Sequence, residues 1–435
     1  MNFKTSLLIN NNLSNKILLC IIFLFPLILI LRSAAINTTL IFVSVFFIIF
    51  YIKKININFL KNKFLIFFIA FFLYLFINAL INNQNFILIL KSLGNYRYLI
   101  LSIIVYFVLC SISDKSKKIF IYFNCFLIIF VGFDIFYQFF FQKDIFGFVP
   151  SMCDSSGKNC QRFSGVFGNE YIGGGYLSQI GLLFFYLLSN QNKGKNYFIL
   201  VIEILFLALL FLTIVVTGER NALIIFLLSI LFYNVYQKKF FNLILICSSF
   251  FILIFILSQK VEFIKNRFVN PLNSLSVMSM HNEKTSATKK IIDSPWVRHY
   301  QAAIELFLER PLIGHGVKSF RVRCEETNIN KQYIKINESY TACSTHPHNY
   351  LMEFLAEYGL IGGVFFLSLL LGITLKLFSI KNKSTKEAKI LLSLGCLLLA
   401  IMFPLKPSGS FLSTFNASIL FYIFGFFLYY STKVK

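Results

Sequence analysis

Long apolar runs with almost no charge recur along the chain, and they restrict its fold more than any other feature. Residues Ile17–Ile30, Phe64–Leu80 and Phe411–Tyr430 are examples. A helix that crosses the hydrocarbon core of a bilayer needs about 20 apolar residues, or about 17 at the short end. Charged residues make up only 14% of the chain, against roughly 25% in ordinary soluble domains. The sequence therefore predicts an all-α, polytopic membrane protein and excludes a soluble one.

The apolar runs number twelve, and their spacing predicts the domain organisation. They cover residues 17–31, 36–52, 64–81, 96–113, 118–141, 173–190, 197–216, 221–237, 240–258, 360–378, 389–405 and 411–430. Nine runs lie in residues 1–258, which we expect to form the first transmembrane region. A long loop follows over residues 259–359, and the remaining three runs form a C-terminal transmembrane region over residues 360–435.

The formal net charge of +23 lies mostly in short clusters between the apolar runs. Cytoplasmic loops of membrane proteins are rich in Lys and Arg, while long loops are largely exempt from this rule. With a cytoplasmic N-terminus, 20 of the 41 Lys and Arg residues fall inside, eight on short outer segments and 13 in residues 259–349. Both termini are thus predicted to be cytoplasmic and the long loop to be outside. The clusters carry no nucleic-acid-binding motif, so membrane lipids and not nucleic acids are the expected partners.

Four of the nine cysteines fall on the predicted outer side, where disulfides persist. They form two pairs that are close in sequence. This spacing predicts the bridges Cys153–Cys160 and Cys324–Cys343. Spacing does not prove connectivity, so free or differently paired thiols remain open. The other five cysteines lie in or beside apolar runs and are expected to act as small hydrophobic residues.

The long loop contains the start signal of a helix at Ser294-Pro295, with Ser as the cap and Pro at the first helical position. This helix is predicted to end near Glu309. One face would carry three polar or small residues, Arg298, Ala302 and Glu305. The expected packing residues are the apolar ones, Trp296, Tyr300, Ile304 and Phe307.

A second helix start is predicted at His346-Pro347, so that His348 and Asn349 would lie in the opening turn. The helix would reach Tyr358 and break at Gly359, where the tenth span begins. Glu353 and Glu357 are expected to be ordinary residues of its polar face.

Five segments in order give the chain a recognisable pattern. The pattern consists of "RFSGVFGNEYIGGGYL" at 162–177, "TGERNA" at 217–222, "RPLIGHGVKSF" at 310–320, "HPHNYLMEFLAEYGLIG" at 346–362 and "FPLKPSGSFLSTFNA" at 403–417. From about residue 130 to the end, the chain resembles the bacterial O-antigen ligase and polymerase family. All five segments lie on the predicted outer face or next to it, as they would in that family.

The resemblance implies glycosyl transfer on the periplasmic face of the bacterial cytoplasmic membrane, by an enzyme of the C type with a long periplasmic loop. The donor would be a glycan on undecaprenyl pyrophosphate, and the acceptor a sugar hydroxyl on lipid A–core or on a second lipid-linked glycan. No nucleotide sugar, cofactor or metal would be required. The essential residues of the family would fall on His348, Arg220 and Arg298.

The chemistry of these residue types agrees with that role. A neutral imidazole can remove the proton of a sugar hydroxyl as the glycosidic bond forms. Arginine pairs the oxygens of a pyrophosphate leaving group bidentately and keeps its charge. Further candidates for substrate binding share a position near the predicted outer face: Arg162, Asn349, His346 and Asp134. His346 and His348 also form a His-x-His pair, but no third metal ligand has a convincing spacing.

Other interpretations of the sequence stay open. A polymerase of the same family shares these motifs and differs mainly in its acceptor. A protein O-oligosaccharyltransferase usually has an extended C-terminal domain, which is not expected here because the chain ends about five residues after its last apolar run. A transporter of lipid-linked sugars is less favoured, because its polar residues would be expected near the middle of the membrane.

Overall fold

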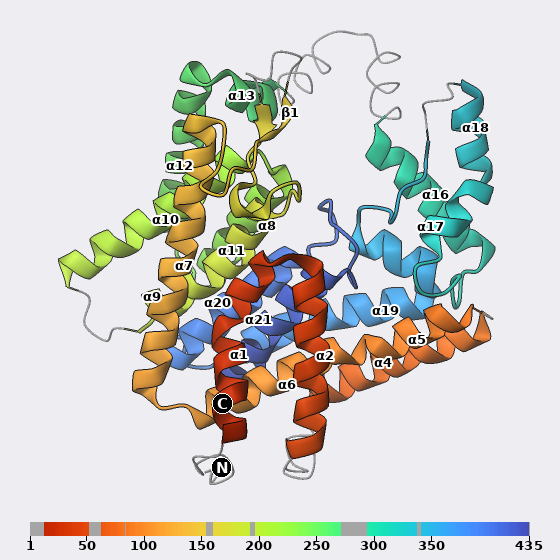
Figure 1. Cartoon of the computed structure of the whole chain (residues 1–435), viewed down its shortest axis with the longest axis horizontal. Helices are drawn as coiled ribbons and strands as arrows, with labels where there is room; N and C mark the ends of the chain where they lie inside the picture. Colours follow the sequence, from red (N-terminus) through yellow and green to blue (C-terminus); the bar gives the residue numbers. More distant parts are fainter. Residues whose placement is uncertain are drawn as a thin grey trace.

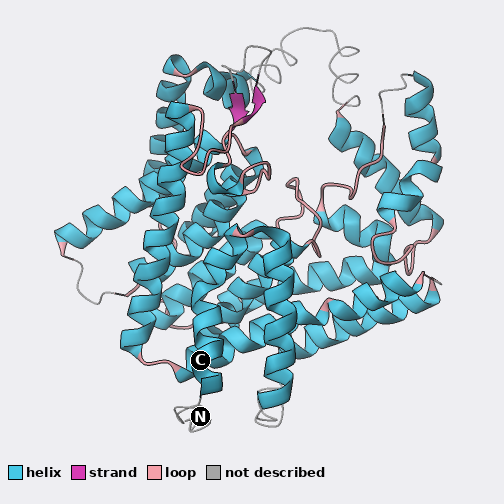
Figure 2. Cartoon of the chain, viewed as in Figure 1, coloured by secondary structure: helices cyan, strands magenta, loops and turns pink. Residues whose placement is uncertain are grey.

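Helices account for nearly all of the regular structure in a computed structural model that describes residues 13–51, 62–82, 84–153, 160–191, 196–270, 294–336 and 341–434 (Figure 2). The long helices coincide with the predicted apolar runs. They are α1 (Leu13–Ile30), α2 (Arg32–Tyr51), α4 (Lys63–Ile81), α5 (Phe86–Gly94) with α6 (Tyr96–Ser111), α7 (Asp114–Phe141), α10 (Tyr197–Thr217), α11 (Arg220–Tyr236), α12 (Phe240–Lys260), α19 (Tyr350–Phe378), α20 (Lys386–Ile401) and α21 (Thr414–Lys433).

The run over residues 173–190 forms a composite helix. It consists of α8 (Gly173–Tyr176), a π-helical turn (Leu177–Gly181) and α9 (Leu182–Ser189). Nine helices among the described residues are long and apolar enough to cross a membrane, while α11 is a shorter apolar helix. The prediction of an all-α, polytopic membrane protein is therefore confirmed.

Helix α21 lies at the centre of the helix bundle and α12 at its edge. Most of α21 is buried, from Phe415 to Tyr430, whereas Ser258 is the one buried residue of α12. Gly425 lets α21 approach α6 closely, because a Cβ there would stand 2.6 Å from the Cβ of Val105. Small residues allow such close helix packing where lipid supplies no hydrophobic driving force. An outward-facing apolar helix such as α12 is expected to face lipid.

Helix ends that were predicted to be cytoplasmic contact one another. Lys117 Nζ donates to Tyr429 Oη over 3.0 Å, which joins the start of α7 to the end of α21. Lys383 Nζ donates to the carbonyl of Tyr236 over 2.8 Å, which joins the α19–α20 connection to the end of α11. At the opposite helix ends, Arg220 and Arg267 contact one another and the end of α10, as described below. The helix order is therefore internally consistent with a single membrane orientation.

Two groups of short elements lie beyond the opposite helix ends, in the upper part of Figure 1. The first contains a hairpin in which β1 (Ser151–Cys153) pairs antiparallel with β2 (Cys160–Arg162). It also contains two elements that come after α12 in the chain, namely α13 (Glu262–Ile264) and a π-helical turn (Lys265–Val269). The second is a small lobe of α16 (Pro295–Glu309), α17 (Phe320–Arg323) and α18 (Asn328–Ile336). In Figure 1 the connection between α20 and α21 lies between the two groups.

Helix α16 has the predicted bounds, but the predicted packing face is wrong. Its buried residues are Arg298, His299, Ala302, Ala303 and Leu306. Trp296 and Ile304 are exposed. Alanines let α16 approach α19 and the disulfide of the lobe closely, and this close packing outweighs the larger apolar area of the other face. Arg298 is therefore a buried residue and not part of a solvated face.

The start of α19 also differs from the prediction. The helix begins at Tyr350, and the Asn349 side chain caps it by accepting a hydrogen bond from Met352 N over 3.1 Å. His348 precedes the cap with φ 57°, a left-handed conformation that cannot continue into a right-handed helix. Asn is among the best N-cap residues, so the cap falls one turn later than Pro347 suggested. The predicted break at Gly359 is confirmed, with φ 64° and ψ −160° inside the helix.

Candidate active site

The first half of α19 is held against the 310–316 segment by its backbone. The amide of Leu360 donates to the carbonyl of Pro311 over 2.7 Å, and the amide of Gly316 donates to that of Glu357 over 2.8 Å. Gly314 and Gly359 meet back to back, since a Cβ on Gly359 would stand 2.6 Å from Gly314 N. Both glycines have positive φ. The kink at Gly359 thus separates the first part of α19, which Asn349 caps, from the longer part that continues to Phe378.

Glu353 and Glu357 are buried, so the expectation that they belong to a polar face is wrong. They are only 3% and 2% exposed. Glu353 accepts hydrogen bonds from Ser410 Oγ and from the amide of Phe411, while Glu357 accepts one from the amide of Lys318. Burying a carboxylate is costly unless hydrogen bonds compensate it. These two carboxylates therefore fix the neighbouring loops to α19.

A turn over residues 404–411 is bound tightly to the residues before α19. Asn349 Nδ2 donates to the carbonyls of Pro404 and Lys406 over 2.6 and 3.1 Å. The amide of Ser408 donates to the carbonyl of His348 over 2.9 Å. This bond helps to hold the left-handed conformation of His348, which costs energy in a residue with a side chain. Asn349 thus positions the turn, and its role in substrate binding stays a prediction.

His348 lies in a cluster of aromatic rings drawn from two elements. Its ring centroid is 4.1 Å from that of His346, 5.4 Å from that of His299 and 4.9 Å from that of Trp296, to which it is perpendicular. His299 is anchored by its Nδ1, which bonds the carbonyl of Ala342 over 2.8 Å. The cluster fixes the position of the His348 imidazole from the sides.

Ser344 contacts the His348 imidazole. Ser344 Oγ lies 2.9 Å from the carbonyl oxygen of His346 and 3.0 Å from His348 Nε2. A hydroxyl can both donate and accept a hydrogen bond. Ser344 therefore helps to fix the orientation of the His348 ring.

Burial, and to a smaller extent the neighbouring rings of His346 and His299, lowers the pKa of His348 from 6.5 to about 4. Burial likewise lowers the pKa of His346 to about 4. A desolvated imidazole resists charging, because its cation loses hydration. His348 is therefore neutral at neutral pH and able to accept a proton.

Arg298 lies beside His299 on α16 and is only 7% exposed. Its guanidinium lies over the ring of Tyr333 of α18, 5.4 Å from the centroid. The positive charge of Arg298 adds to the lowering of the pKa of His299, which burial dominates. Arg298 thus lies on α16, the helix that also carries His299 of the histidine cluster.

Arg220 belongs to a second cluster, where α10 ends and α11 begins. Arg220 Nε donates to the carbonyl of Arg267 over 2.9 Å, and Arg267 Nε donates to that of Gly218 over 2.8 Å. Gly218 has φ 69° and packs against β2, where a Cβ would stand 2.4 Å from the carbonyl oxygen of Gln161. This contact brings the end of β2, and with it Arg162, to the same place.

The three arginines repel one another. Burial, and to a smaller extent the charges of Arg162 and Arg220, lowers the pKa of Arg267 to about 10. Glu219, the acid next to Arg220, accepts hydrogen bonds from the amides of Gly174 and Gly175 over 2.7 and 3.1 Å. Its negative charge offsets part of the repulsion at Arg162 and Arg267. Such a concentration of guanidinium groups attracts an anion.

Two residues near these clusters, Arg267 and Lys406, were not predicted from the sequence. Arg267 was counted only among the charges of a long loop, and no motif marked it. Lys406 was counted among the outer basic residues, although it lies within the segment 403–417 that resembles the family. Lys406 is 3% exposed, lies 5.2 Å from the ring centroid of Tyr350, and has its pKa lowered to about 7 by burial.

Asp134 ties the outer end of α7 to the loop that follows. Its carboxylate accepts from the amide of Ile145 over 2.9 Å, and Gln138, one turn later, accepts from the amide of Gly165 over 2.9 Å. A Cβ on Gly165 would stand 2.6 Å from Asp134 Oδ2. These contacts hold the segment that leads from Arg162 to α8. A direct role of Asp134 in substrate binding stays a prediction.

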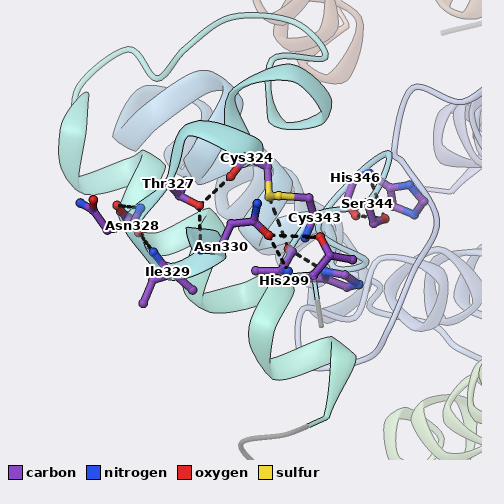
Figure 3. The surroundings of a disulfide bond; sticks show 12 residues. His299, Cys324, Thr327, Asn328, Ile329, Asn330, Cys343, Ser344 and His346 are labelled. Carbon is purple, nitrogen blue, oxygen red and sulfur yellow. Dashed lines mark hydrogen bonds between the residues drawn. A yellow bond between two sulfur atoms is a disulfide. The ribbon is translucent and has the colours of Figure 1, made fainter. Parts of the chain in front are cut away.

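Both predicted cysteine pairs are joined in the structure, with S–S distances of 2.01 Å for Cys153–Cys160 and 2.11 Å for Cys324–Cys343. The first links β1 to β2. Figure 3 shows the second, which joins the lobe to the irregular segment before His346. Asn330 supports the same segment, since its Oδ1 accepts from the amide of Ala342 over 2.9 Å. This disulfide therefore holds the chain one residue before Ser344.

The described residues contain no group of three or more His, Cys, Asp or Glu side chains placed to hold a metal ion. Their contacts bring His348, His346 and Asn349 together with the elements of Arg298, and Arg220 together with Arg162.

These features define a polytopic α-helical membrane protein with two clusters of polar residues beyond one set of helix ends. Residues 205–367 match the family model described as O-antigen ligase. This match supports the resemblance of the chain to the O-antigen ligase and polymerase family. The matched residues include Arg220, Arg267, Arg298 and His348. No curated protein matches the chain.

Proposed function

We propose that the protein transfers a glycan from undecaprenyl pyrophosphate to a sugar hydroxyl of lipid A–core, on the periplasmic face of the bacterial inner membrane. The observation that carries this proposal is the buried imidazole of His348, which is neutral at neutral pH and held in place by the rings of His346 and His299. A general base must be neutral and within about 2.6–3.2 Å of the proton that it removes.

In the proposed reaction, the His348 imidazole takes the proton of the acceptor hydroxyl as the hydroxyl oxygen bonds the anomeric carbon of the donor sugar. The bond between that carbon and the pyrophosphate oxygen breaks at the same time. Its electron pair stays on undecaprenyl pyrophosphate, which leaves. No metal takes part in this scheme, because the arginines supply the positive charge.

The pyrophosphate would be held by Arg220, Arg162 and Arg267, whose mutual repulsion an anion relieves. Guanidinium groups bond phosphate oxygens in pairs. Arg298 would act from the side of the histidine cluster, next to His299. His346 and Asn349 would then line the acceptor side, and Asp134 would support Arg162 through the loop after α7.

The outer position of both clusters is part of the proposal. It is supported by the distribution of Lys and Arg along the chain and by the separate contacts of the two sets of helix ends. A transporter would be expected to have polar residues at mid-membrane. The clusters lie at helix ends, which favours an enzyme acting on a lipid at the membrane surface.

The alternative is a polymerase that joins lipid-linked repeats with the same residues. A deletion strain separates the two functions. Free lipid-linked polymer should accumulate if the protein is a ligase, whereas single repeats on the core would mean a polymerase.

His348→Ala, expressed in that strain at the wild-type level in the membrane, tests both functions at once. We expect it to reproduce the deletion phenotype, since general bases contribute about 10²–10⁴-fold. Normal attachment and normal chain length in this variant would contradict the proposal.

A further inference from the structure

Trp296 is the sole tryptophan of the chain, and it lies beside His348. It is the second residue of α16, and its ring stands perpendicular to the imidazole at 4.9 Å between centroids. The packing face of α16 lies elsewhere, on Arg298, Ala302 and Leu306. Accordingly, Trp296 remains 44% exposed. One part of the indole thus contacts the proposed base, and another part is open to a ligand.

The position of the indole relative to His348 limits what can lie against it. A hydroxyl that gives its proton to His348 must approach within about 2.6–3.2 Å of the imidazole. The sugar ring that carries this hydroxyl then lies next to the indole. An aromatic face has a negative quadrupole, which attracts the partly positive C–H groups on the apolar face of a sugar ring. Tryptophan also offers a large contact area at a small entropic cost.

We propose that Trp296 is the platform on which the acceptor sugar stacks while His348 removes its proton. This inference rests on the proposed function and adds the residue that recognises the acceptor. Trp296 favours the acceptor side because its contacts are with the histidine cluster, whereas the arginines that would hold the donor form the other cluster.

A purely supporting role of Trp296 makes a different prediction. If the indole only held the imidazole in place, its loss would lower kcat and leave the KM for the acceptor unchanged. If it binds the acceptor, Trp296→Leu should raise the acceptor KM about 10-fold, with kcat and the donor KM changed little. Trp296→Phe keeps a ring and should restore most of the affinity. Leu308→Ala, an exposed apolar change farther along α16, serves as the matched control.

Binding can also be observed directly, because the intrinsic tryptophan fluorescence of this protein reports on Trp296 alone. The purified protein is titrated with lipid A–core in the absence of the lipid-linked donor, and lipid A without core sugars is the control. We expect lipid A–core to shift the emission saturably, and lipid A to have no such effect. His348→Ala should keep this response.

The outcomes separate this inference from the proposed function. An inactive His348→Ala variant that still shows the saturable shift supports both. An active wild-type protein with no shift for lipid A–core, and a normal acceptor KM in Trp296→Leu, overturns the platform and leaves the function standing. An active His348→Ala variant overturns the proposed base, whatever the fluorescence shows.

Discussion

At the scale of single residues, the low pKa of His348 sets a pH dependence. Its pKa of about 4 lies below the ordinary 6.5, so the imidazole stays neutral and basic until the pH falls close to 4. We expect kcat/KM for the acceptor to stay level from about pH 8 to pH 6 and to fall only in more acidic solution. An acid limb centred near pH 6.5 would contradict the buried base.

His346→Gln is the matched variant for this profile. It removes a neighbouring ring that lowers the pKa of His348 and lets water closer to the imidazole. The acid limb should therefore move to higher pH. His299, on α16, faces the same imidazole and would keep part of the effect.

The arginine cluster makes a separate prediction about the donor. Arg267→Gln should raise the KM for the lipid-linked donor about 10- to 100-fold, because a hydrogen bond to a charged group is worth about 1.5–3 kcal/mol. Arg267→Lys keeps the charge and loses the planar fork of the guanidinium group. Its donor KM should therefore lie between that of the wild-type protein and that of Arg267→Gln. Kinetics with varied donor and saturating acceptor measure this. An unchanged donor KM in Arg267→Gln would remove this residue from the site.

His348 and Arg220 were found from the sequence because each lies in a short segment with a recognisable pattern. Arg267 was not, because it reaches the site through a backbone contact with Gly218, 49 positions earlier in the chain. Lys406 likewise is joined to the residues before α19 only through the 404–411 turn, where its carbonyl accepts from Asn349. Contacts between distant segments leave no local pattern in a single sequence.

At the scale of elements, the kink of α19 depends on Gly359. Its φ of 64° with ψ of −160° is a conformation that only glycine adopts readily, at a cost of about 1–3 kcal/mol for other residues. A Cβ would also stand 2.4 Å from the backbone of Leu312. Gly359→Ala should therefore lower the amount of folded protein in the membrane, as measured by immunoblot and by thermal stability in detergent.

Gly372→Ala on the same helix is the control. Its Cβ would meet Phe64 at 3.4 Å, an ordinary contact, and alanine is a better helix former than glycine. We expect normal levels of this variant. Equal levels of both variants would show that the kink is not required.

The disulfide Cys324–Cys343 is expected to stabilise the lobe and the segment that leads to His348. Cys343→Ser should destabilise the protein by about 2–4 kcal/mol and lower transfer activity, whereas Cys247→Ser, an exposed free cysteine of α12, should do neither. Mass spectrometry of the unreduced protein should find the Cys324–Cys343 peptide. Wild-type activity of Cys343→Ser would remove the disulfide from the account of the site.

Hydropathy located the long helices because the bilayer imposes one length and one polarity on all of them. It did not locate the buried face of α16, which carries two alanines and Arg298. Nor did it locate the start of α19, where Asn349 and the 404–411 turn decide the cap. These outer elements are shaped by contacts that periodicity does not contain.

At the scale of the whole molecule, the twelve apolar segments support two clusters beyond one set of helix ends. The arginine cluster is carried by β2, α11 and the π-helical turn after α13, and the histidine cluster by α16 and the residues before α19. Each cluster is held by backbone contacts between segments far apart in sequence. In our proposal, one cluster holds the lipid pyrophosphate and the other activates the acceptor.

Transfer in a reconstituted membrane tests this account most directly. Purified protein in liposomes is given an undecaprenyl-pyrophosphate-linked glycan and lipid A–core, and the glycosylated acceptor and released undecaprenyl pyrophosphate are measured. We predict both products in equal amounts from the wild-type protein, and at least about 10²-fold less of each from a folded His348→Ala variant. Transfer by His348→Ala at the wild-type rate would contradict the account.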